Sequence, residues 1–161
     1  MTPPRPAPTR PWALASAGVA ALVAVVLAAP LVEGGAAVRA AFSHVCHQLP
    51  DRSLWLGGGP VALCHRCLGV VAGLAAGTLA APLVPALRAL GGVRAGRWLA
   101  AAALPMAVDW LVGAAGVWAN TPASRLATGA AFGVAAGLFL AEALLRRVPP
   151  RPGLHPTTPL T

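Results

Sequence analysis

Residues 67–87 read CLGVVAGLAAGTLAAPLVPAL, a run without a single charged side chain. Three further runs are similarly poor in charge. Residues 12–32 have no charged side chain, and residues 98–118 and 126–145 contain one acidic side chain each. An α-helix needs about 20 apolar residues to cross roughly 30 Å of hydrocarbon. The four runs therefore predict an all-α, polytopic membrane protein with four transmembrane helices.

The overall composition agrees with a membrane protein and argues against a soluble domain. The 161-residue chain is 57% hydrophobic and 10% charged, whereas a soluble domain usually carries about 25% charged residues. The net charge of +8 would suggest nucleic acid as the partner of a soluble protein. Here the arginines lie in short segments between the apolar runs, where they meet lipid headgroups. We expect the lipid bilayer as partner, and no nucleic acid.

The chain is expected to form one transmembrane domain between two tails. Residues 1–11 and 148–161 are rich in proline, which predicts disorder. The domain covers residues 12–147, and its residues 33–60 form an outer loop that contains cysteine and histidine. Within this loop, residues 36–45 are predicted to form an interfacial helix, because their apolar side chains share one face. The transmembrane helices are predicted at residues 12–32, 61–87, 98–118 and 122–146.

Arginine counts in the flanking segments predict the orientation. Eight of the twelve arginines lie in or directly beside the two tails and in the turn at residues 88–97, and four lie in or beside the segments at residues 33–60 and 119–125. This excess places both termini in the cytoplasm and makes the chain a multi-pass protein of the cell (plasma) membrane. A cleaved signal peptide is the alternative for residues 12–32, but that run exceeds the usual apolar signal core of about 7–15 residues.

Two predicted helices carry glycine at every fourth position. That spacing places each set of glycines on one helix face, where a neighbouring helix can approach closely. An arginine lies just before each set, which suggests that the chain contains a duplicated helical hairpin. The same faces would also permit a homo-oligomer. The glycines are Gly69, Gly73 and Gly77 in the first helix and Gly129, Gly133 and Gly137 in the second.

The first loop and the start of the second predicted helix contain every cysteine of the chain. Cys46 and His47 are adjacent, and Cys64 and Cys67 form a C-x-x-C pair that can meet across one helical turn. Three thiolates and one imidazole suit tetrahedral zinc, with His65 as a spare ligand. The sequence therefore predicts an outward-facing zinc-type metal site, although thiolates also bind copper and iron.

Other functions of the same residues stay open. The C-x-x-C pair of Cys64 and Cys67 could cycle between dithiol and disulfide, as in a membrane thiol–disulfide oxidoreductase. A static disulfide, Cys64–Cys67 or Cys46–Cys64, is a further possibility, and because the number of cysteines is odd it would leave one cysteine free. The third functional class is a small-solute transporter acting as an oligomer. The sequence shows no nucleophile–base pair, phosphate loop or carboxylate dyad, so we assign no catalytic residue and favour a non-enzymatic protein.

Asp109 lies about halfway along the third predicted helix. A carboxylate at that depth is unfavourable by about 2.5–3.5 kcal/mol on insertion scales, so it needs a partner or a wet cavity. The arginines at the outer starts of the second and fourth helices can reach it. We expect either a polar pocket that opens outward or a structural ion pair. The residues assigned to this pocket are Asp109, Arg66, Arg125, Asn120, Arg52 and Ser53.

These polar residues occur in one combined pattern, C-H-Q-x-P-x-R-S, then C-x-R-C-x-G, then D, then N-x4-R-x2-T-G. The pattern resembles that of a domain-of-unknown-function family of small bacterial polytopic membrane proteins, over about residues 42–137. The resemblance implies the membrane topology and singles out the residues of the pattern, and it implies no known reaction. The chain departs from the family where Trp110 replaces a glycine and where no tyrosine lies near Val71.

Overall fold

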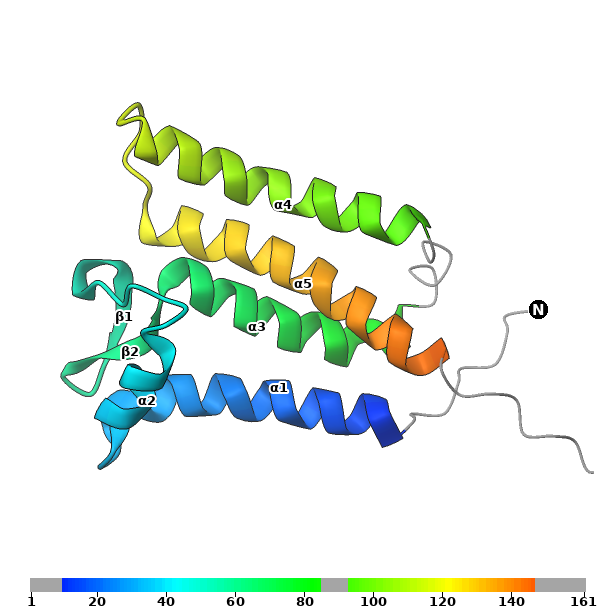
Figure 1. Ribbon diagram of the computed structural model, residues 1–161, viewed down its shortest axis with the longest axis horizontal. Helices are drawn as coiled ribbons and strands as arrows, with labels where there is room; N and C mark the ends of the chain where they lie inside the picture. The colour runs from blue at the N-terminus through cyan, green and yellow to red at the C-terminus, as the bar shows by residue number, and fades with distance from the viewer. Residues whose placement is uncertain (1–9, 85–92, 147–161) are drawn as a thin grey trace, which may run out of the picture.

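The computed structural model describes residues 10–84 and 93–146 of the chain (Figure 1). The predicted tails lie outside these residues, except that Arg10 and Pro11 already belong to the first helix. Proline suits the first turn of a helix, where its missing N–H would have no partner. The chain is mostly helical, and its long helices are α1 (Arg10–Ala28), α3 (His65–Ala80), α4 (Val93–Ala114) and α5 (Pro122–Arg146).

The long helices lie side by side in the order α1, α3, α5, α4 (Figure 1). Helices α3 and α5 run in the same direction, whereas α1 and α4 run in the opposite one. The start of α1 and the end of α5 therefore lie at one end of the bundle. The end of α1, the starts of α3 and α5 and the end of α4 lie at the other, together with a small sheet.

Three of the described helices are long and apolar enough to cross a membrane. They are α1 with the 3-10 turn η1 (Ala29–Leu31), α3 with the turn η3 (Ala81–Leu83), and α5. Helix α4 is not among them, because Arg97, Pro105 and Asp109 lower its hydropathy. The protein is thus a membrane protein with three candidate spans in its described part. The fourth predicted span is not confirmed.

The predicted helix over residues 61–87 begins later than expected. Residues 59–64 form strand β2 (Gly59–Cys64), which pairs antiparallel with β1 (Ser53–Leu56). Gly57 and Gly58 join the strands with φ of 58° and 88°, a left-handed conformation that suits a tight hairpin turn. These glycines close a hairpin, so residues 61–64 belong to a strand and not to the predicted helix. The helix begins at His65, and the last predicted residues lie outside the described part.

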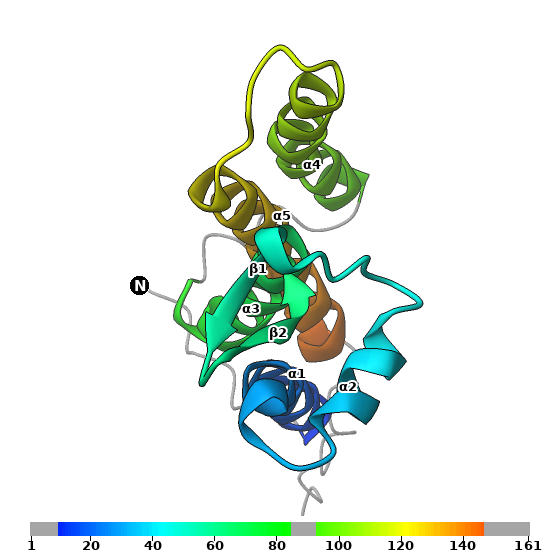
Figure 2. The ribbon, with the colours of Figure 1, turned by 90° about the vertical axis from the view of Figure 1, so that its left-hand side faces the viewer.

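The segment predicted as a loop contains further short elements. Helix α2 (Gly35–Phe42) falls largely within the predicted interfacial helix, and the 3-10 turn η2 (Pro50–Arg52) precedes the sheet. Figure 2 shows the sheet and α2 at the end of the bundle. Beneath them lies a buried apolar cluster that includes Val26 of α1, Val61 and Leu63 of β2 and Leu68 of α3. This cluster fixes the loop against the bundle.

The bounds of the last two helices test the predicted helix signals. Helix α4 begins and ends earlier than residues 98–118, and Gly116 follows it with φ of 69°, a left-handed conformation typical of helix C-termini. Helix α5 has the predicted bounds. The backbone N–H of Ser124 donates to Thr121 Oγ1 at 3.0 Å, so Thr121 caps the start of α5.

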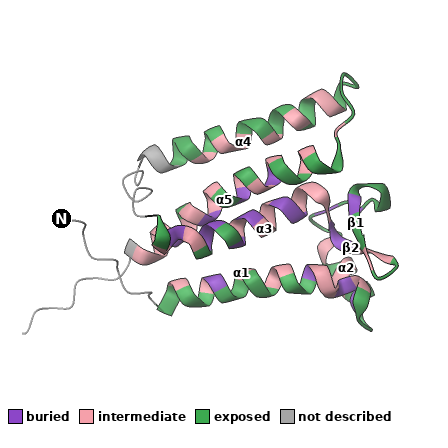
Figure 3. Cartoon of the chain, turned by 180° about the vertical axis from the view of Figure 1, so that it is seen from behind, coloured by how far each residue is buried: buried purple, intermediate pink, exposed green. Residues whose placement is uncertain are grey.

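The glycine faces of α3 and α5 meet each other, which confirms the predicted close approach. A Cβ added at Gly73 would overlap the backbone carbonyl of Ala130, and one added at Gly133 would overlap that of Val70. The two helices contact each other symmetrically, since Gly69 faces Leu126 as Gly129 faces Arg66. We call this contact the glycine seam. Buried residues gather on α3, whereas α4 is exposed or half-buried in its described part (Figure 3).

Candidate metal centre and adjoining cavity

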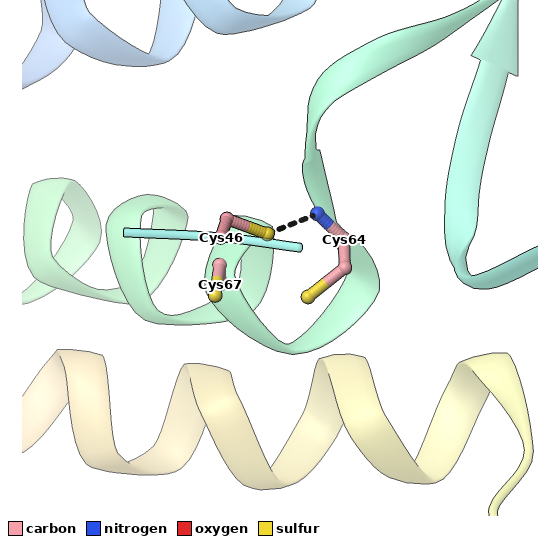
Figure 4. Close-up of side chains that lie close together, drawn as sticks. All are labelled: Cys46, Cys64 and Cys67. Atoms are coloured by element: carbon pink, nitrogen blue, oxygen red, sulfur yellow. Dashed lines mark hydrogen bonds between the residues drawn. The ribbon is translucent and has the colours of Figure 1, made fainter. Parts of the chain in front are cut away.

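All three cysteines converge at the end of the bundle that carries the sheet. Cys46 follows α2, Cys64 ends β2, and Cys67 lies in the first turn of α3. Their Sγ atoms lie within 4.8 Å of one another (Figure 4). No disulfide joins them. Cys46 is buried, and Cys64 and Cys67 are half-buried.

Two polar side chains fold the segment of Cys46 back onto β2. Arg39 of α2 donates from Nη1 to the carbonyl oxygen of Pro60 at 2.7 Å. Gln48 donates from Nε2 to the carbonyl oxygens of Arg39 at 2.7 Å and Ala62 at 2.8 Å. Gln48 is buried and has φ of 50°, a left-handed conformation that is uncommon outside glycine. The chain therefore reverses just after Cys46 and His47.

Hydrogen bonds within the cluster favour the thiolate form of Cys64. The backbone N–H of Cys64 donates to Cys46 Sγ at 3.2 Å (Figure 4). The hydrogen bond from the Cys67 side chain lowers the pKa of the Cys64 thiol, although burial acts in the opposite direction. The thiolate is the state that binds metals and attacks disulfides.

The histidines stand apart from the sulfur cluster. Among the described residues, the group whose ligand atoms converge consists of Cys46, Cys64 and Cys67, and His47 lies outside it. His47 is exposed and lines a cavity next to the cluster. The spare ligand His65 is also outside the group, and its Nδ1 is buried without a hydrogen-bond partner in the described structure. The structure thus brings together three of the four predicted ligands.

The cavity beside the cluster has a volume of about 660 Å³. Residues from the loop before β1, from the start of α3, from the end of α4 and from the start of α5 line it. The predicted pocket residues that line it are Arg52, Arg66, Asn120 and Arg125, together with the three cysteines and His47.

Asp109 and Ser53 have other positions. Asp109 of α4 forms an ion pair with Arg66 of α3, and Asn120 Nδ2 donates to the Asp109 carbonyl oxygen. The Arg66 and Asp109 side chains are 21% and 11% exposed, so this pair is largely shielded from solvent. Ser53 is buried, and its hydroxyl donates to the carbonyl oxygen of Leu49 at 2.9 Å. It does not line the cavity.

Sequence reasoning missed the residues that hold the site in place. Arg39 was counted only as a flanking charge, and Gln48 only as part of a pattern. Trp110 and Trp118 line the cavity as well, although tryptophan near a helix end usually indicates contact with the membrane interface. The sequence signal that could have found Gln48 is its position directly after the Cys46-His47 pair.

Comparisons with known proteins agree with the membrane architecture. The family described as "Predicted membrane protein (DUF2085)" matches residues 46–139, a range that contains the three cysteines and the cavity arginines. The uncharacterized protein MJ1492 of Methanocaldococcus jannaschii is 36% identical over 72 residues, which is 44% of each chain. No solved structure matches the chain. The chain belongs to the DUF2085 family of predicted membrane proteins.

Proposed function

We propose that this protein holds one metal ion of the zinc type on Cys46, Cys64 and Cys67, at the outer end of its transmembrane bundle. The convergence of three free sulfurs within 4.8 Å carries the proposal. Tetrahedral zinc–sulfur bonds near 2.3 Å place sulfurs about 3.5–4 Å apart. The described arrangement needs little movement to reach that geometry.

The surroundings of the sulfurs support a metal centre. Cys46 accepts an N–H hydrogen bond, and bonds of this kind orient metal ligands and tune the metal. His47 lines the adjoining cavity and is the proposed fourth ligand, with a water molecule as the alternative. Thiolates bind copper and iron as well as zinc, so the identity of the metal is the first quantity to measure.

The first prediction concerns metal content. Protein purified in detergent under reducing conditions should contain about one metal ion per chain by elemental analysis, because three thiolates and one further ligand satisfy one tetrahedral ion. Serine at Cys46 or Cys67 should abolish stoichiometric metal. His47→Ala should weaken metal affinity by at least about tenfold, by analogy with the loss of supporting residues at metal sites. Bound metal should also protect the thiols from alkylation.

His44→Ala is the matched control, since His44 is exposed, lies three positions before His47 and does not line the cavity. Metal affinity should be unchanged in this variant. Metal-free protein from cells grown with zinc, copper and iron would contradict the proposal, as would wild-type and Cys46→Ser protein with equal metal content.

Thiol–disulfide exchange is the second candidate, because the same sulfurs are within reach of one another and Cys64 and Cys67 flank the start of α3. It predicts a different result. Metal would be lacking in the reduced preparation, and in protein purified without reductant two sulfurs would form a disulfide. Single-cysteine variants would trap a mixed disulfide with a partner protein.

We further propose that α4 is a fourth span and that both termini are cytoplasmic. Helix α4 has 22 residues, and at a rise of 1.5 Å per residue it is about 33 Å long, enough to cross the hydrocarbon layer. The sheet and the start of α3, which carry Cys64 and Cys67, lie at the end of the bundle opposite to the start of α1. Trp12 Nε1 donates to the carbonyl oxygen of Thr78 at 2.9 Å, which supports a retained first helix.

The second prediction tests this topology. Reporter fusions or insertions should place residue 55 outside and residues 92 and 155 inside, because the arginine excess keeps the latter segments in the cytoplasm. The readout is the paired activity of a reporter active only outside and one active only inside. Residue 118 should behave like residue 55. An inside signal at residue 55 would place the cysteines in the cytoplasm and contradict the orientation.

A further inference from the structure

The cavity beside the cysteines has an excess of positive charge. Arg52, Arg66 and Arg125 line it, and its lining contains no aspartate or glutamate. Arg66 is paired with Asp109. Within residues 10–84 and 93–146, the structure records no ion pair for Arg52 or Arg125. Two guanidinium charges at one cavity therefore have no ion-pair partner among the described residues.

The fold adds to this positive potential. Helices α3 and α5 both begin at this end of the bundle (Figures 1 and 2), and the N-terminus of a helix carries a partial positive charge. The Nε atom of Arg66 is buried without a hydrogen-bond partner in the described structure, although buried donors are normally paired. Arg66 thus has donor capacity beyond its bond to Asp109.

The cavity lining also contains aromatic side chains. Trp110 of α4 and Trp118 after α4 belong to it. A volume of about 660 Å³ falls within the range of about 300–1,000 Å³ for small-molecule sites. The cavity accordingly exceeds the needs of an inorganic ion and offers an apolar surface beside the arginines.

We propose that this cavity binds an organic phosphate, with the phosphate group at Arg52, Arg66 and Arg125 and the apolar body against Trp110 and Trp118. Guanidinium groups bind phosphate through paired hydrogen bonds. A phosphate monoester carries about −1.5 to −2 charges at neutral pH, which matches the two arginines without a described ion-pair partner better than a carboxylate does. The arginines are not metal ligands, so the inference goes beyond the metal site and does not depend on it.

A soluble organic phosphate and a lipid headgroup share this chemistry, and two arms of one experiment separate them. In the first arm, phenyl phosphate is titrated into the full-length protein in phosphatidylcholine nanodiscs, and tryptophan fluorescence is recorded. In the second arm, the nanodiscs also contain phosphatidic acid. Saturable quenching in the first arm assigns a soluble phosphate. A fluorescence change produced by phosphatidic acid, together with no response to phenyl phosphate, assigns a lipid headgroup.

Variants connect the signal to the cavity. Arg125→Gln should weaken binding by at least about tenfold, since hydrogen bonds to charged groups contribute that much to affinity. Arg97→Gln is the matched control, because Arg97 is exposed and lies outside the cavity lining. Both variants lower the net charge by one, yet only Arg125→Gln should change the affinity. Inorganic phosphate should bind more weakly than phenyl phosphate.

Three results would overturn the proposal. The first is a lack of saturable change in both arms. The second is an equal loss in Arg125→Gln and Arg97→Gln, which would indicate attraction to the overall charge alone. The third is benzoate binding as tightly as phenyl phosphate. Chelator-stripped protein, whose metal content is measured in the same sample, should still bind phenyl phosphate, so failure of the metal site and failure of the phosphate site give different results.

Discussion

Gly133→Ala should lower the free energy of unfolding by at least about 2 kcal/mol, because an extra methylene or methyl group in a packed core typically destabilises a protein by about 1–3 kcal/mol. A Cβ at this position would overlap the backbone of Val70 and Leu74 in α3. Backbone atoms cannot rotate away as side chains can, so the whole helix must shift. Gly73→Ala should have the same effect from the other side of the glycine seam, because its Cβ would overlap the backbone of Ala130. Unfolding in a denaturing detergent series, followed by helix signal and tryptophan fluorescence, measures the loss.

Gly18→Ala provides the control for this comparison. Gly18 lies inside α1, and a Cβ there would have no atom within 4 Å. Its unfolding curve should match that of the wild type or shift slightly towards higher stability, because alanine favours helix more than glycine does. Equal unfolding curves for Gly18→Ala and Gly133→Ala would show that the helices at the glycine seam can separate without loss of stability, so that the seam has no role in packing.

The second large effect is expected at the ion pair between α3 and α4. Asp109→Ala leaves the charge of Arg66 without its carboxylate partner in a largely shielded position. Removing one partner of a buried pair typically destabilises a protein by about 3–5 kcal/mol, and we expect at least about 2 kcal/mol here because the adjoining cavity can admit water. The measurement is the same detergent unfolding series.

A double substitution sharpens that test. Arg66→Met together with Asp109→Ala removes both charges, so it should recover part of the stability lost in Asp109→Ala. Asp51→Asn serves as the control, since Asp51 is exposed in the turn η2 and a surface change of this kind usually alters stability by less than about 0.5 kcal/mol. A double variant that is less stable than Asp109→Ala would contradict the explanation that the unpaired charge of Arg66 causes the loss of stability.

The helical part of the fold could be predicted because its signals are local. A long uncharged run indicates a helix in a membrane wherever the rest of the chain lies, and the start of α5 follows from Thr121 and Pro122 alone. The glycine spacing also predicted the correct contact faces of α3 and α5. The fourth span stays a proposal, because Arg97, Pro105 and Asp109 make α4 less apolar than the other helices.

The site was harder to predict because it depends on contacts distant in the sequence. The strand β2 exists only because the Gly57–Gly58 turn brings β1 beside it, and apolar residues 61–64 are equally suited to a helix or a strand. His47 neighbours Cys46 in sequence, yet its ring nitrogens lie outside the group that the three cysteine sulfurs form. Adjacency in sequence therefore did not identify the fourth ligand.

The glycine seam also restricts how the bundle can move. Its glycines recur every four residues, slightly more than one helical turn. A slide of α3 along α5 by one or two residues would bring the β-carbons of Val70, Leu74 or Val134 against the facing backbone. The close contact at the glycine seam therefore opposes translation of α3 along α5. Any widening of the cavity has to come from α4 swinging outward or from the loop after α2 lifting away.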